Sequence, residues 1–143
     1  MDIIGTFAYM GEPKTLLVAL LAALVAFGVG GLWYAPKVFG AYWMSEMGMD
    51  MSDHKAGSAK WVGMAKMYAL TLVQAILLVV VLGQVATAPT GALLGVLVAM
   101  GFVATMIGVN NIAERRTLKF FMINAGYAVL SFAIMGAMIG QLL

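Results

Sequence analysis

A short polar stretch, NNIAERRTLKFF at positions 110–121, contains the residues whose types and spacing best suit chemistry in this chain. On a helix, Asn110 and Asn111 precede Glu114 by four and three residues, so the three side chains share one face. Amide and carboxylate groups arranged in this way can hydrogen-bond a small polar ligand. The neighbouring cations Arg115 and Arg116 can face anionic lipid headgroups.

A second polar stripe follows in the next apolar segment. Asn124, Tyr127 and Ser131 are spaced at i, i+3 and i+7 and so lie on one helical face. Buried amides need hydrogen-bond partners in lipid, and we expect the two stripes to form a polar zipper across a tight turn. The alternative is a cleft that binds a lipid headgroup or small ligand. Its candidate residues are Trp33, Tyr34, Asn110, Asn111, Glu114, Arg115, Arg116, Asn124 and Tyr127.

Sulfur-bearing side chains gather in MSEMGMDMSDH, positions 44–54. Thioethers and imidazole are ligands that suit Cu(I), which makes a weak metal candidate. The chain holds 13 methionines and no cysteine, so the cluster is less surprising and thiolate chemistry is excluded. We interpret the methionines as flexible packing residues and predict neither a metal nor a cofactor. The residues concerned are Met44, Met47, Met49, Met51 and His54.

Other activity classes find little support in the residue types. His54 is the single histidine, and no triad or paired carboxylate can be assembled at a membrane site, so we do not expect an enzyme. No basic face or stripe is present, so we expect no nucleic-acid partner. No charged residue falls in the middle of an apolar segment, whereas proton-coupled transporters normally have such groups.

The composition indicates the elements that must carry these side chains. Hydrophobic residues make up 64% and charged residues 10% of the 143 residues, and the mean hydropathy is +1.01. A soluble domain carries about 25% charged residues, so we predict an all-α integral membrane protein, because helices satisfy their own backbone groups in lipid. About 20 apolar residues cross a bilayer. This length predicts four transmembrane helices in a single domain (1–143), at about 15–34, 67–85, 91–112 and 120–142.

The connection between the first two spans contains an amphipathic segment at about 37–47. Its aromatic residues share one helical face, and we expect a helix that lies in the membrane interface. All but one of the eight lysines and arginines fall in the two connections on this side. By the positive-inside rule these loops are cytoplasmic and both termini are outside, which means periplasmic if the membrane is a bacterial inner membrane.

Small residues recur four apart within the predicted spans. This spacing lets helix backbones approach closely. We expect the small residues to serve bundling within the chain first, with assembly into homo-oligomers as the second use. They are Ala22, Ala26 and Gly30, then Gly91 and Gly95, and finally Gly136 and Gly140.

Three motifs carry a family resemblance. Leu-Trp-Tyr-x-Pro at 32–36, GMAKMY at 63–68 and ERRTLKFFMINAGY at 114–127 occur in order along the chain. The chain resembles, from about Leu16 to Gly140, an uncharacterised family of small four-span membrane proteins catalogued as domain of unknown function 1761. Thr117 stands where proline is more usual. The resemblance implies a four-helix fold and a membrane location, and it implies no activity.

Two short segments of the chain show a weak internal similarity. GVGGL (28–32) and GVNNI (108–112) end alternate spans, which suggests two parallel helical hairpins, 15–85 and 91–142. We predict a non-enzymatic multi-pass membrane protein. It self-associates, or it binds membrane lipid or a small ligand at its cytoplasmic rim. The alternative is a small homo-oligomeric transporter or channel.

Overall fold

The computed structural model describes residues 3–50, 58–83 and 87–143, and every element in these ranges is helical. Among these residues, four helices are long and apolar enough to cross a membrane. They are α2 (Pro13–Trp33), α4 (Ser58–Leu82), the continuous run of α5 (Ala88–Val98), η3 (Ala99–Ala104) and α6 (Thr105–Ala113), and α7 (Leu118–Leu142). The predicted all-α, four-span membrane protein is therefore confirmed.

Two span boundaries differ from the prediction for identifiable reasons. Helix α4 begins at Ser58 rather than near residue 67, because long cationic side chains at a span end can snorkel and do not stop a helix. Helix α5 begins at Ala88 rather than at residue 91, since Pro89 stands in its first turn, where a missing N–H costs nothing. The side chain of Thr87 caps this start by accepting from the N–H of Thr90.

Four shorter elements refine the expected architecture. The helix predicted at 37–47 is present as the π-helical η1 (Pro36–Gly40) and α3 (Ala41–Glu46). An N-terminal helix, α1 (Ile3–Met10), was not predicted. Nor was the π-helical segment η3, which widens the third span in its middle. The two-hairpin repeat stays a prediction.

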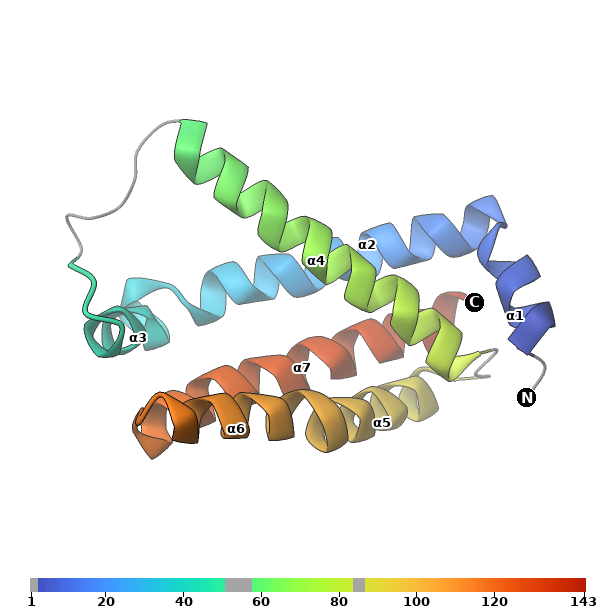
Figure 1. The fold of residues 1–143 in the computed structure, drawn as a ribbon. Coiled ribbons are helices and arrows are strands. Elements are labelled where there is room, and N and C mark those ends of the chain that lie inside the picture. The colour runs from blue at the N-terminus through green and yellow to red at the C-terminus, as the bar shows by residue number, and fades with distance from the viewer. Residues whose placement is uncertain (1–2, 51–57, 84–86) are drawn as a thin grey trace.

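The helices form a bundle with two distinct ends (Figure 1). Helix α3 and the α6–α7 turn lie at one end, which we call the charged end because Arg115, Arg116 and Lys119 are there. Helix α1 and the C-terminus lie at the other end. Helix α7 packs against both α2 and α5, and α2 also packs against α4. Helix α7 is consequently the most buried span.

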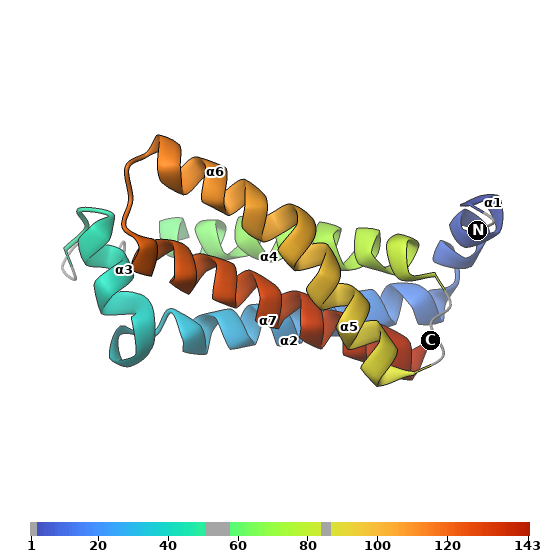
Figure 2. The ribbon, with the colours of Figure 1, turned by 90° about the horizontal axis from the view of Figure 1, so that it is seen from below.

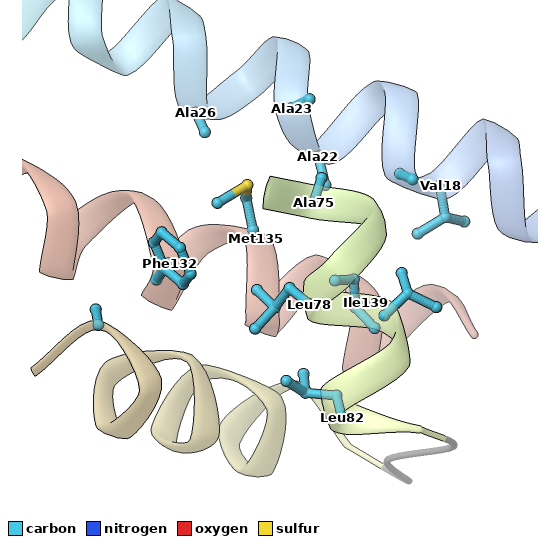
Figure 3. Packing of buried hydrophobic residues seen from close by; sticks show 13 residues of the cluster. Val18, Ala22, Ala23, Ala26, Ala75, Leu78, Leu82, Phe132, Met135 and Ile139 are labelled. Atoms are coloured by element: carbon cyan, nitrogen blue, oxygen red, sulfur yellow. The ribbon is translucent and has the colours of Figure 1, made fainter. Parts of the chain in front are cut away.

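The core is built from small side chains on α2 and larger ones on its partners. Ala22 and Ala26 are fully buried, and Met135 of α7 points toward them (Figure 3). Leu78 of α4 and Ile139 of α7 complete this layer. The alanines let the neighbouring helices approach α2 closely enough to gain dispersion contacts, the main source of packing energy in lipid.

The glycine stripes of α5 and α7 face each other. A Cβ atom on Gly91 would overlap the carbonyl of Gly136, and one on Gly95 would overlap the carbonyl of Phe132. A Cβ atom on Gly140 would likewise overlap the carbonyl of Thr87. These stripes therefore serve contacts within the chain. A pore lined by copies of the same faces would first require this packing to open.

Candidate functional site

Asn124 of α7 is the centre of a polar and aromatic cluster at the charged end. Its Oδ1 accepts a 2.8 Å hydrogen bond from the hydroxyl of Tyr34 and a 3.1 Å bond from Nε1 of Trp43. One turn further on, the hydroxyl of Tyr127 donates to the carbonyl of Ala26 at 3.0 Å. The rings of Tyr34 and Tyr127 meet edge to face at 5.3 Å. This face of α7 is thus fastened to α2 and to the segment after it.

The segment 34–46, which we call the strap, reaches Asn124 because the chain turns sharply after α2. The N–H of Tyr34 still donates to the carbonyl of Gly30 at 2.9 Å, and Ala35 is then extended, as a residue before proline must be. A Cβ atom on Gly40 would overlap the carbonyl of Tyr34, so only glycine permits this return. The turn directs α3 across the end of α7 (Figure 1).

The strap is also bound to the α6–α7 turn through Thr117. The N–H of Thr117 donates to Oε1 of Glu46 at 3.0 Å, and its Oγ1 lies 2.8 Å from the hydroxyl of Tyr42. The same Oγ1 caps α7 by accepting from the N–H of Phe120. Arg116 donates to the carbonyl of Glu46. Tyr42 and Trp43, two of the aromatic residues in the predicted interfacial helix, therefore use their polar atoms on α7 and its cap.

The α6–α7 turn is closed by its own polar residues. Arg116 donates its N–H to the carbonyl of Asn111, and Arg115 adopts a left-handed conformation (φ 54°), which is the Schellman ending of a helix. The side chain of Asn111 donates to the carbonyls of Arg116 and Thr117 at 3.3 and 3.2 Å. Glu114 pairs with Arg116 at 3.3 Å. Asn111 and Glu114 thus fasten the turn.

The two polar stripes consequently have different partners from those we expected. The α7 stripe faces α2 and the strap, so Asn124 and Tyr127 join Trp33 and Tyr34. The Nε1 of Trp33 donates to the carbonyl of Ile123 at 3.0 Å. Asn110 and Arg115 are exposed. Ser131 is buried within α7. The Ser131 hydroxyl has no hydrogen-bond partner among the described residues, and the expected zipper between α6 and α7 is absent from these contacts.

Tyr34 stays protonated in this cluster. It lies just beyond the end of α2. Burial, and secondarily the neighbouring Tyr127, raise the pKa of its hydroxyl well above the usual value. A neutral hydroxyl is the form that can donate to Asn124. Tyr34 therefore acts in this cluster as a hydrogen-bond donor to Asn124.

An open apolar groove of about 600 Å³ lies beside this junction. Helix α7 forms its floor, η3 forms one wall, and the ring of Trp33 contributes at the charged end. All of its lining residues are apolar, and sequence reasoning singled out only Trp33 among them. A run of small residues along one face of α7 was the available signal. The lining comprises Trp33, Met100, Ala104, Phe121, Met122, Ala125, Gly126, Val129, Leu130 and Ala133.

The groove follows from how the third span meets α7. Backbones touch at the glycines of α5, whereas toward the charged end the ring of Phe121 stands against Gly108 of α6. Figure 2 shows α5 crossing close to α7 and α6 diverging from it. The two helices touch at one end and are separated by the Phe121 ring at the other, which leaves the groove between them. The π-helical segment η3 lies along this groove, and such segments are frequent at functional sites.

The weak metal candidates are dispersed where the structure describes them. Met44, within the strap, is buried, while Met47 and Met49 are exposed. Met51 and His54 lie outside the described residues. Within the described ranges, no three His, Cys, Asp or Glu side chains gather as a metal site would require. The metal interpretation thus gains no support from these residues.

One of the comparisons with known proteins finds a match, and that match assigns no activity. The model of a family described as protein of unknown function, DUF1761, matches residues 17–140. No curated protein and no solved structure matches the chain. The matched range includes the strap, the α6–α7 turn and the whole lining of the groove.

Proposed function

The chain belongs to the DUF1761 family, whose description assigns no activity, and we propose from the site that it is a lipid-binding multi-pass membrane protein. An acyl chain of a membrane lipid would lie in the groove between α7 and η3, with its polar end toward the strap and the α6–α7 turn. The charged end would face the cytoplasm. The observation that carries this proposal is the apolar groove itself.

The size and lining of the groove suit an acyl chain. Its volume of about 600 Å³ falls within the 300–1,000 Å³ common for ligand sites. The side-chain nitrogen of the lining, Nε1 of Trp33, is already bonded to the carbonyl of Ile123, so no side chain of the lining demands water. Hydrophobic transfer adds little inside a bilayer. Retention would therefore depend on dispersion contacts, which a groove between two helices supplies in greater number than a smooth helix face.

The distribution of charge supports the orientation. Six cations of the described residues lie at span ends on the charged side of the bundle (Figure 1): Lys37 after α2, Lys60 and Lys66 near the start of α4, and the three cations of the α6–α7 turn. Lys14 lies at the opposite end, at the start of α2. Positive charge of this asymmetry directs the richer end to the cytoplasm. A reporter fused after Leu143 that is active only outside the cytoplasm is the expected result.

The lipid proposal is tested by filling the groove. The full chain is purified in mild detergent, and retained lipids are counted by native mass spectrometry. Leucine at both Ala104 and Ala133 places bulk in the groove, and the double variant should retain much less lipid than the wild type. The matched control is the double variant Ala65→Leu/Ala69→Leu, which adds the same bulk at two exposed positions of α4 outside the groove.

The two outcomes are distinguishable. Lipid retention that falls in the double variant and persists in the control supports a site in the groove. Equal retention in all three proteins would mean that the lipid is held elsewhere, and the proposal would be wrong. The thermal midpoint of each variant is measured alongside, so that a loss through unfolding is recognised.

A further inference from the structure

Resting on the proposed function, we propose that the lipid held in the groove is an anionic phospholipid whose headgroup is bound by Lys119, with Arg115 as a second cation. The groove accounts for an acyl chain but not for a choice among lipids, because every membrane lipid has such chains. The choice must come from polar groups at the end of the groove. Lys119 and Arg115 are exposed at the charged end, and neither has a carboxylate partner among the described residues.

Lys119 is placed at the end of the groove by the geometry of α7. It precedes Met122 by three residues and Gly126 by seven, and both of these line the groove. Residues at this spacing share one helical face. Lys119 therefore lies one turn beyond the groove, toward the charged end. A lipid whose acyl chain lies in the groove would have its headgroup beside Lys119.

An aromatic ring positions the ammonium group of Lys119 and leaves its charge unneutralised. Its Nζ lies 4.1 Å from the centroid of the Tyr42 ring, a cation–π contact. Tyr42 is itself held by Thr117. An aromatic ring carries no net charge, so Lys119 keeps its full attraction for an anion.

The neighbouring cations contribute unequally. Arg116 is occupied by Glu114, by the carbonyl of Glu46 and by the ring of Phe120, which lies 5.5 Å from the guanidinium carbon. Arg115 projects from the turn with an exposed side chain. The arrangement thus offers a phosphate one cation positioned by the Tyr42 ring and a second, exposed cation. A cation near a membrane surface favours an anionic lipid about fivefold.

The net charge of the lipid distinguishes this proposal from general lipid binding. A zwitterionic headgroup brings its own cation, which offsets the attraction of its phosphate to Lys119. A phospholipid with a net negative charge has no such offset. The matched pair of probes is therefore phosphatidylglycerol and phosphatidylcholine with identical acyl chains.

The experiment exchanges each probe onto the purified full chain in detergent and counts retained molecules by native mass spectrometry. We expect the wild type to retain phosphatidylglycerol about fivefold more than phosphatidylcholine. Lys119→Gln should remove most of this preference, and Lys119→Arg should keep it. Lys66→Gln makes the same change of charge on α4, away from the groove, and should leave the preference intact.

The failure of this inference and of the proposed function look different. Equal retention of both probes by the wild type, with loss of both in the groove-filled variant, overturns the headgroup assignment alone. Undiminished phosphatidylglycerol retention in the groove-filled variant overturns both. If Lys119→Gln does not fold, raising the salt concentration on the wild type replaces it. The preference must then shrink, because salt screens exposed charges, and a constant preference counts against the proposal.

Discussion

The hydroxyl of Tyr34 donates a 2.8 Å hydrogen bond to Oδ1 of Asn124, 90 residues further along the chain. This bond joins the end of the first span to the beginning of the fourth. Trp43 donates to the same oxygen from the strap. One amide oxygen thus links the first span, the strap and α7 at the end of the bundle where the groove begins.

Asn124 should be the most sensitive polar residue of this junction. Asn124→Leu keeps the approximate volume but leaves Tyr34 and Trp43 without an acceptor, and the free energy of unfolding should fall by about 2 kcal/mol. The thermal midpoint in detergent measures this. Asn110→Leu is the matched control, because Asn110 is exposed on α6 and should change the stability by less than about 0.5 kcal/mol. Equal midpoints for the two variants would contradict the role of Asn124.

The contact of α5 with α7 predicts opposite effects for two glycine substitutions. Gly95→Ala would push a methyl group into the carbonyl of Phe132, and overpacking of this kind should cost about 3 kcal/mol. A Cβ atom on Gly63 of α4 meets nothing within 4 Å, so Gly63→Ala should be neutral or stabilising by about 1 kcal/mol. Chemical denaturation in mixed micelles compares them, and a harmless Gly95→Ala would disprove the close approach.

Thr117 should matter through its hydroxyl. Thr117→Val is nearly isosteric and removes both the cap on Phe120 and the bond to Tyr42. We expect a loss of about 1 kcal/mol in stability, the usual effect of losing an N-cap. Thr105→Val is the control, since the Thr105 hydroxyl bonds only to carbonyls of its own helical run, Gly101 and Phe102. Loss of the same size at both positions would assign the effect to valine rather than to the cap.

The same substitution at two adjacent arginines should act in opposite directions. Arg115 has a φ of 54°, a conformation that costs a side-chain-bearing residue about 1 kcal/mol, so Arg115→Gly should raise the thermal midpoint. Arg116→Gly should lower it, because the pair with Glu114 and the contacts with Glu46 and Phe120 are lost. A fall in both midpoints would show that the Arg115 side chain itself stabilises the turn. Arg115→Gly should also weaken the preference for anionic lipid while it stabilises the fold.

The local features of this chain could be predicted because they depend on neighbouring residues. Four apolar segments of bilayer length, the amphipathic segment after Pro36 and a charged turn near Arg115 are properties of composition over short windows, and each appears in the structure. The early start of α4 and the π-helical segment η3 were missed, because a few lysines or a widened turn leave the hydropathy almost unchanged.

The pairing of helices was decided only by the tertiary structure. A side chain that faces lipid and one that faces another helix are both apolar, so the sequence has no contrast from which to assign the faces of a span. Asn124 therefore read as a partner for the adjacent α6, yet it is bound by residues from before α4. The groove could not be predicted from the sequence either. It forms because the glycines of α5 contact α7 while the ring of Phe121 separates α6 from α7.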